Sequence, residues 1–205
     1  MKFIIGIKLG MSQIFDETGK RIPVTLIEAG PCYVTQIKQK QAVKEGKNGD
    51  GYEALQLGFQ ALKDSKVKKP LKAKPYRRLK EFKEEIDIAK YKVGDKIDVS
   101  SFNVGDKVSV SGISKGKGFA GMIKRWGASR KPTTHGAKHQ TRAMGSVGCR
   151  FPQRVVKGRK MPGRLGAERV TISDLKIVKI DKENNILAVK GAVPGRAGMM
   201  VEVRG

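Results

Sequence analysis

The side chains with the most evident chemistry in this chain are cations crowded into one quarter of its length. Residues 115–169 carry fifteen lysines and arginines but a single carboxylate, Glu168. Like charges at this density repel one another, and a polyanion that neutralises them releases condensed counterions. Ten glycines in the same stretch allow the backbone to bend and to approach a partner closely. The pattern therefore predicts an extended arm that threads into folded RNA.

The overall composition supports a nucleic-acid partner and argues against other classes. The 205 residues carry a formal net charge of +24, and the sequence pI is about 10.2, which is typical of nucleic-acid-binding proteins. An anionic membrane also attracts such charge, but it favours an amphipathic helix, and the arm shows none. No run approaches the roughly 20 apolar residues that cross a bilayer. The first residues show no secretory leader, and the two cysteines cannot form a disulfide framework. We therefore expect a cytoplasmic protein.

A glycine motif at residues 116–121, GKGFAG, matches the pattern of nucleotide-binding loops and follows an expected strand. A dinucleotide-binding fold also needs an acidic residue about 20 positions onward for the ribose. Between this motif and Glu168 no acidic residue occurs, and the aspartate motifs of kinases are missing as well. We interpret this stretch as a flexible stem whose amides and lysines meet phosphates.

The two histidines, His135 and His139, have a spacing that can bind zinc on a helix. Gly136 lies between them, no acidic or cysteine ligand completes a site, and the surrounding cations oppose a metal ion. Hydrogen bonding or stacking with RNA is the functional interpretation, and a role as plain polar loop residues is the alternative. No acid–base or nucleophilic constellation is present. The sequence thus predicts no enzyme, no catalytic residue, no metal site and no cofactor.

Three aromatic side chains lie in the predicted arm: Phe119, Trp126 and Phe151. Trp126 follows two cations, and an indole face accepts both bases and cations. The alternative is that Trp126 packs where the arm meets the rest of the protein. The sequence leaves both roles open.

Strand patterns occur on both sides of the arm, so we expect a loop that projects from one β body. Before the arm they lie at 3–7, 14–15, 22–27, 33–37 and 55–59, and after it they lie at 170–172, 175–180, 186–189 and 199–203. Turn signals at 16–19, at Asn184-Asn185 and at Val193-Pro194-Gly195 predict hairpins, and the glycines of 46–51 predict a loop. A Val-Gly-Asp-Lys turn, at 93–96 and again at 104–107, precedes an alternating strand each time, as in small closed barrels.

Residues 63–92 differ in character from the strands around them. The stretch from Lys66 to Arg78 is cationic and is broken by two prolines, so we expect an inserted lobe with at most one short helix. The lobe is either a second RNA contact or a solvated surface face.

Ordered motifs recur along the whole chain. They are GIKLGMSQIF at 6–15, SKGKGFAG at 114–121, KRW at 124–126, THG at 134–136, GSVG at 145–148, VKGRKMPG at 156–163 and KGAVPG at 190–195. In these motifs the sequence resembles the family of bacterial large-subunit ribosomal protein three.

The resemblance implies a mainly β fold, with a translation-factor-like β-barrel, a small inserted α/β lobe and a long, basic, irregular extension. We assign the barrel to residues 1–62, 93–113 and 167–205, the lobe to 63–92 and the rRNA-penetrating loop to 114–166. Members of this family are structural proteins of the large subunit that bind 23S rRNA near its 3′ end, nucleate assembly and extend toward the peptidyl transferase centre. The implied partners are this rRNA and the neighbouring ribosomal proteins fourteen and nineteen, with neither a membrane nor a small-molecule substrate.

One departure from the family concerns the distal part of the loop. Some bacterial members carry a methylated glutamine a few residues after the Gly-Ser-x-Gly motif. Here Cys149-Arg150-Phe151-Pro152 follows the motif, and Gln153 does not align with the modified position. The modification is therefore not assigned to this chain.

The predicted rRNA-binding residues are the cations, aromatics and histidines of the loop. They are Lys115, Lys117, Phe119, Lys124, Arg125, Trp126, Arg130, Lys131, His135, Lys138, His139, Arg142, Arg150, Phe151, Arg154, Lys157, Arg159, Lys160 and Arg164. Two alternative functions are a nucleotide-using factor and a general RNA chaperone. A nucleotide-using factor on the same barrel would need a P-loop, which is missing, and a general RNA chaperone would not prefer structured RNA over random RNA.

Overall fold

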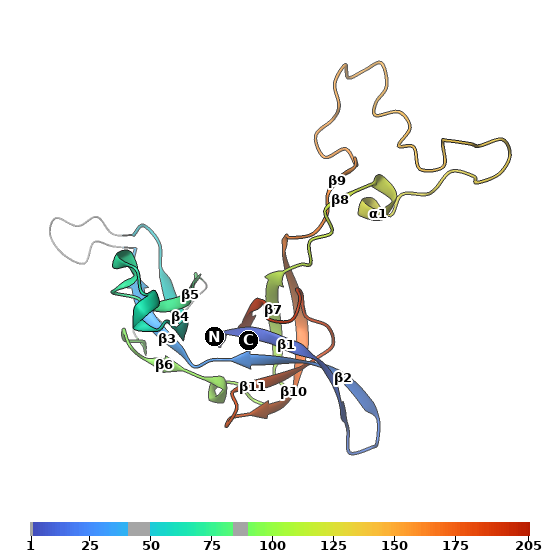
Figure 1. Cartoon of the computed structure of the whole chain (residues 1–205). Helices are drawn as coiled ribbons and strands as arrows, with labels where there is room; N and C mark the ends of the chain where they lie inside the picture. Colours follow the sequence, from blue (N-terminus) through green and yellow to red (C-terminus); the bar gives the residue numbers. More distant parts are fainter. Residues whose placement is uncertain (1, 41–49, 84–89) are drawn as a thin grey trace. The chain divides into compact units, whose positions relative to one another are not determined.

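The computed structural model describes residues 2–40, 50–83 and 90–205, and the chain divides into two units (Figure 1). The body comprises Met1–Ile113 and Arg169–Gly205, and the arm comprises Ser114–Glu168. Strands dominate the body, which confirms the mainly β class. The backbones of Lys2 and Gly205 exchange two hydrogen bonds of 3.1 and 2.8 Å, so the two ends of the chain lie side by side.

Six antiparallel strands of the body close into a barrel in the order β1-β12-β7-β10-β11-β2. The strands are β1 (Phe3–Phe15), β2 (Arg21–Ala29), β7 (Lys107–Ile113), β10 (Arg169–Asp181), β11 (Ile186–Lys190) and β12 (Met200–Arg204). Closure leaves no open edge around the ring. Strands β7 and β10 flank the arm in the sequence and pair with each other, from Arg169 opposite Ile113 to Lys176 opposite Lys107. Both ends of the arm therefore emerge from one rigid pair of strands.

Two of the three predicted hairpins are confirmed. The third, at 193–195, is wrong, because β11 pairs with β10 and β2 whereas β12 pairs with β1 and β7. Between β1 and β2, the Asp16 amide donates to the Lys20 carbonyl at 2.9 Å, and Gly19 adopts a φ of +73°. Between β10 and β11, Asn185 takes a φ of +53°. Hydrogen bonds from Asn184 to the Asp181 carboxylate stabilise this turn and hold the pKa of Asp181 below its usual value.

A second sheet has the strand order β5-β4-β3-β6. Its strands are β3 (Cys32–Lys38), β4 (Ala54–Ala61), β5 (Tyr76–Phe82) and β6 (Lys96–Ile97). Strands β3 and β4 lie within residues 1–62 and β6 lies within 93–113, two ranges that the sequence assigns to the barrel; all three strands pair in the second sheet instead. Alternating residues reveal a strand but not its partner. The edges of β1 and β2 are occupied by β12 and β11, so β3 pairs with β4 and β6 instead.

The predicted lobe, 63–92, contributes to this second sheet. Its described residues form the 3₁₀ helices η1 (Asp64–Lys66) and η2 (Lys69–Leu71) and strand β5. No α-helix occurs in the described part of this range, 63–83 and 90–92. The two Val-Gly-Asp-Lys turns are present, with Gly94 and Gly105 at φ +99° and +94°. The first leads to β6 of the second sheet, followed by η4 (Val99–Ser101), and the second leads to β7 of the barrel. Most of the loop predicted at 46–51 lies outside the described residues.

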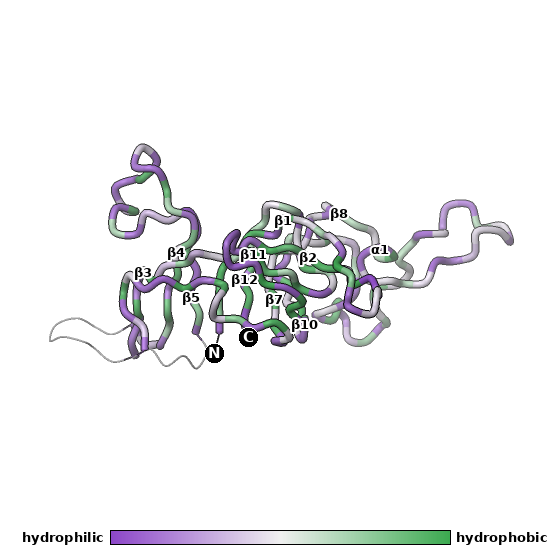
Figure 2. The backbone as a smooth tube through the Cα atoms, turned by 90° about the horizontal axis from the view of Figure 1, so that it is seen from below, coloured by the Kyte–Doolittle hydropathy of each residue, from purple (hydrophilic) through white to green (hydrophobic). Residues whose placement is uncertain are grey.

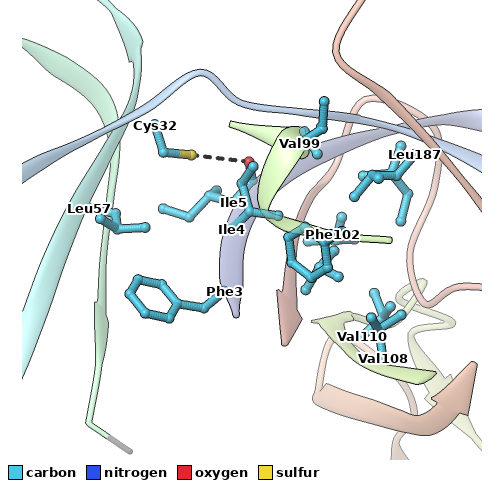
Figure 3. Packing of buried hydrophobic residues seen from close by; sticks show 14 of the residues in the cluster. Phe3, Ile4, Ile5, Cys32, Leu57, Val99, Phe102, Val108, Val110 and Leu187 are labelled. Carbon is cyan, nitrogen blue, oxygen red and sulfur yellow. Dashed lines mark hydrogen bonds between the residues drawn. The ribbon is translucent and has the colours of Figure 1, made fainter. Parts of the chain in front are cut away.

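One continuous core joins the barrel to the second sheet. Strand β1 begins with three buried residues in succession, Phe3, Ile4 and Ile5, because both of its faces are covered. The Phe3 ring lies 4.9 Å from the Phe82 ring of β5. Figure 3 shows this packing, with Leu57 of the second sheet on one side of β1 and Leu187 of the barrel on the other. In Figure 2 the hydrophobic residues accordingly follow the barrel strands.

The thiol of Cys32 belongs to this core. Its Sγ donates to the Ile5 carbonyl at 3.4 Å, and burial raises its pKa to about 12. A thiol with so high a pKa forms almost no thiolate at neutral pH, so Cys32 is an unreactive packing residue.

A buried carboxylate, Glu202 of β12, holds three cations where the two sheets meet. Its oxygens lie 3.0 Å from Lys80 Nζ of β5, 2.5 Å from Arg169 Nη2 of β10 and 3.4 Å from Arg204 Nη2. The Glu202 side chain is 5% exposed. These ion pairs connect the second sheet to the barrel and fix Arg169, the first residue after the arm.

Replacing Glu202 by glutamine keeps the side-chain shape but removes the negative charge on which Lys80, Arg169 and Arg204 converge. We expect Glu202→Gln to lower the free energy of unfolding by about 2 kcal/mol, since hydrogen bonds to charged groups contribute about 1.5–3 kcal/mol. Chemical denaturation measures the change. The exposed Glu183→Gln is the control and should stay within about 0.5 kcal/mol of the parent. Equal denaturation midpoints for both variants would show that Glu202 does not hold the sheets together.

Candidate nucleic-acid interface

The arm begins as a paired stem. Strands β8 (Phe119–Ala120) and β9 (Gly163–Arg164) are antiparallel. The Lys117 amide donates to the Leu165 carbonyl, and the Leu165 amide donates to the Gly118 carbonyl, both at 2.9 Å. The Ser114 amide donates to the Glu168 carbonyl at 2.9 Å. The stem therefore sets where the remainder of the arm starts.

Gly166 allows the two sides of the stem to approach. Its φ is +77°, and a Cβ at this position would overlap the carbonyl oxygen of Lys115. A side chain is thus excluded both by the backbone conformation and by the neighbouring strand. This is the one glycine of the arm where both constraints act on backbone atoms.

A short helix, α1 (Met122–Trp126), follows β8 at the far end of the stem. It ends at Gly127, which takes the left-handed conformation common after helices. Trp126 Nε1 and Arg125 Nη1 both donate to the Met161 carbonyl at 2.9 Å. The Arg125 guanidinium also lies 5.0 Å from the centre of the Trp126 ring. The bonds of both side chains are therefore made within the arm, a role that neither sequence alternative for Trp126 had included.

The distal part of the arm, residues 128–160, consists of turns. The Lys131 amide donates to the Thr141 carbonyl at 3.2 Å, and Arg159 Nη2 donates to the Ser146 carbonyl at 3.0 Å. No residue in this range is buried, and Ala120 is the arm's buried residue. The distal arm thus has no hydrophobic core to hold it.

The electrostatics of the arm are almost entirely cationic. Its 55 residues, all described, contain fourteen lysines and arginines and one carboxylate, Glu168. Thirteen of these cations are exposed, and Arg125 is half-buried. No salt bridge joins any of them to a carboxylate among the described residues. Such an array can bind several phosphates at once.

Two aromatic rings accompany the cations. Phe119 is 81% exposed and Phe151 is 72% exposed, which makes both rings available for stacking on a base. His135 and His139 are exposed in turns, and His135 has a positive φ of 59°. In the described part of the chain, no three histidine, cysteine or acidic side chains gather as a metal site would need.

The predicted binding residues fall into three groups along the arm. Lys115, Lys117, Phe119 and Arg164 lie on the stem, and Lys124, Arg125 and Trp126 lie on α1. The others lie on the distal turns or just before β9: Arg130, Lys131, His135, Lys138, His139, Arg142, Arg150, Phe151, Arg154, Lys157, Arg159 and Lys160. The sequence does not reveal the roles of Met161, Ser146 and Gly166. The first two accept hydrogen bonds through their backbone carbonyls, and Gly166 allows the stem strands to approach.

Comparison with known proteins identifies the chain. A family model described as ribosomal protein L3 matches residues 54–186. A protein of Carboxydothermus hydrogenoformans named large ribosomal subunit protein uL3 is 52% identical over 99% of this chain and 96% of its own length. The proteins of the same name from Desulfitobacterium hafniense and Pelotomaculum thermopropionicum are 51% and 47% identical, over 95% and 99% of this chain. The chain belongs to the ribosomal protein L3 family.

Family membership confirms the resemblance seen in the sequence motifs and the prediction that the chain is not an enzyme. For the L3 family, the arm with its exposed cations is the natural candidate for an RNA interface. In the described residues, no helix is long and apolar enough to span a membrane.

A substitution at Gly166 tests whether the stem organises the arm. We expect Gly166→Ala to open the stem and to accelerate amide hydrogen exchange at Lys117 and Leu165 by about tenfold or more. The reason is that 1–3 kcal/mol of backbone strain corresponds to roughly 5- to 150-fold in opening. Gly121→Ala is the matched control, because its Cβ would meet nothing within 4 Å. Unchanged exchange at both amides in Gly166→Ala would contradict the stem's dependence on this glycine.

Proposed function

We propose that this protein is a structural constituent of the large ribosomal subunit and that its arm binds 23S rRNA. The observation that carries the proposal is the arm itself: thirteen exposed cations on a described segment with a single carboxylate. The names of its relatives, which are large ribosomal subunit proteins, support the same assignment. The barrel, which we propose is of the translation-factor type, is the support from which the arm extends.

Ordering of the arm depends on its partner. The distal turns bury no residue, so few contacts within the protein offset the loss of backbone entropy. Phosphate neutralisation removes the repulsion between cations and releases counterions, and both effects favour an ordered arm on RNA. Coupled ordering of this kind suits a protein that binds rRNA directly and early. As the family resemblance implies, we include binding near the 3′ end of 23S rRNA and nucleation of subunit assembly in the proposal.

The distal arm is the part that extends toward the peptidyl transferase centre in this proposal. Arg150 and Phe151 combine a cation that binds phosphate with a ring that stacks on unpaired bases. Ribosomal proteins fourteen and nineteen are the proposed protein neighbours, as the family resemblance implies.

Salt dependence of rRNA binding tests the role of the arm's cations. We expect a quadruple lysine-to-glutamine variant of the arm to show a log–log salt slope less steep by about 3, at roughly 0.7 per lost phosphate contact. Filter binding of full-length protein to isolated 23S rRNA at several salt concentrations measures the slope. The substituted residues, all exposed, are Lys124, Lys131, Lys138 and Lys157.

The matched control removes the same charge from the body. Its four exposed lysines, also changed to glutamine, are Lys20, Lys107, Lys182 and Lys190. A control slope close to that of the parent, with a weaker slope for the arm variant, supports the proposal. If both variants keep the parental slope, phosphate contacts do not govern binding through the arm. If the parent binds random RNA as well as 23S rRNA, the protein is a general RNA chaperone instead.

Phe151→Ala tests the function of the distal arm. We expect this change to alter the rate of peptidyl transfer, or sensitivity to antibiotics that act at that centre, in ribosomes that carry the variant at full occupancy. Because Phe151 is 72% exposed, melting of the free protein should stay unchanged. Val155→Ala, which truncates another exposed apolar side chain of the arm, is the control. Parental translation and drug response in the Phe151 variant would show that the ring does not contribute there.

A further inference from the structure

The positive charge of the body is concentrated in one short segment. Outside the arm the chain has 29 basic and 18 acidic residues. Residues 63–80, which we call the basic segment, contain nine of those basic residues and one of the acidic ones, a net charge of +8. The rest of the body has 20 basic and 17 acidic residues and is nearly balanced. The segment is therefore distinct from an ordinary charged surface, where both signs are interspersed.

The basic segment is folded by its own hydrogen bonds. Its residues 63–75 form a loop that connects β4 to β5 through η1 and η2, and its residues 76–80 belong to β5. The Leu62 amide donates to the Pro75 carbonyl at 2.8 Å and closes the loop. Within the loop, the Lys66 amide donates to Lys63 and the Leu71 amide donates to Lys68, each at 2.8 Å. Figure 2 shows hydrophilic residues recurring along this connection.

Lys74 anchors the segment to the second sheet. Its Nζ donates to Gln56 Oε1 of β4 at 2.7 Å and to Gln36 Oε1 of β3. Two strands thus hold the base of the loop. In contrast to the distal arm, the segment has a fixed attachment to the folded body.

The lysines of the loop face solvent without an acidic partner. The exposed ones are Lys63, Lys66, Lys68, Lys69 and Lys72, and no salt bridge joins them to a carboxylate among the described residues. Elsewhere on the body, lysines do find such partners: Lys2 lies 2.6 Å from Asp106, and Lys38 lies 2.9 Å from Glu81. The segment keeps its cations close together at the cost of mutual repulsion, which an external anion would relieve.

We propose that the basic segment is a second RNA contact, which holds the phosphate backbone of the same RNA that the arm binds. The proposal rests on the proposed function. Between residues 63 and 75 every cation is a lysine and no residue is aromatic, so the loop offers point charges rather than planar groups that read or stack on bases. Contacts of this kind position RNA without selecting its sequence.

An acidic protein surface fits the segment less well. Protein interfaces have an apolar core, and lysine is depleted in them. The basic segment has no large exposed hydrophobic residue, whereas protein–nucleic acid interfaces are polar and strongly positive. Because the loop is already folded, little backbone ordering opposes binding, and a second contact on one RNA raises the overall affinity by effective concentration.

A quadruple glutamine variant of the full-length protein tests the inference. The substituted residues are Lys66, Lys68, Lys69 and Lys72. We expect affinity for 23S rRNA at physiological salt to fall by about tenfold or more, and the log–log salt slope to weaken by about 3. A structured RNA of another sequence should lose affinity by a similar factor, since phosphate contacts carry no sequence information. All four side chains are exposed, so the melting temperature should match that of the parent.

The arm variant and the body control described above separate the possible outcomes. If the arm variant weakens binding while the basic-segment variant behaves like the body control, this inference fails and the proposed function stands. If only the basic-segment variant weakens binding, the proposed role of the arm fails instead. Competition with polyglutamate completes the test. If polyglutamate displaces RNA from the parent but not from the basic-segment variant at equal charge concentration, the segment is a site for acidic protein, and the inference is overturned.

Discussion

Repulsion between like charges is the constraint on which the arrangement of this protein depends. Of the net charge of +24, the arm carries +13 and the basic segment carries +8. The arm connects β7 to β10, and the basic segment consists of the β4–β5 connection and the first residues of β5, so neither contributes a strand to the closed barrel. The remaining body is nearly neutral, so its strands can approach to hydrogen-bonding distance without a large electrostatic cost. Segregation of charge into connections therefore lets one chain combine a stable fold with a strongly cationic surface.

Glu202 shows what is required where cations must converge on the folded body. Lys80, Arg169 and Arg204 come from three strands, and one carboxylate that is 5% exposed serves all three. Burial of the carboxylate strengthens these ion pairs relative to fully exposed ones, although water still reaches the Arg169 side chain, which is 52% exposed. The same interaction fixes Arg169, the first residue after the arm, and Lys80, the last residue of the basic segment. One buried anion thus pairs with a cation next to each of the two cationic stretches.

The sequence predicted the strands well but not all of their partners. In residues 33–37 and 55–59, apolar and polar side chains alternate, a pattern that is the same for a strand of the barrel and for a strand of any other sheet. These strands are excluded from the barrel because the edges of β1 and β2 are already paired with β12 and β11. Both copies of the Val-Gly-Asp-Lys turn are formed, but the barrel predicted from the repeat holds only for the second copy, since the first leads to β6 of the second sheet. Two hairpins were predictable because Asp16 to Gly19 and Asn184-Asn185 determine their turns locally. Pairing over long sequence separations is decided by the whole fold.

The candidate interface divides in a similar way. Charge and glycine content revealed the arm without any structure, since electrostatic repulsion depends on composition. The roles of Arg125 and Trp126 were not visible, because their shared acceptor is the backbone carbonyl of Met161, and any residue supplies a carbonyl. The structure thereby separates two kinds of cation that look alike in sequence. Arg125 and Arg159 use their guanidinium groups to shape the arm, whereas the exposed lysines make no such bond. A free lysine loses only hydration and rotamer freedom when it meets a phosphate. Substitution of Arg125 would also remove its hydrogen bond to the Met161 carbonyl, which holds the arm in shape. Substitution of the exposed lysines is therefore the way to weaken binding while the arm keeps its shape.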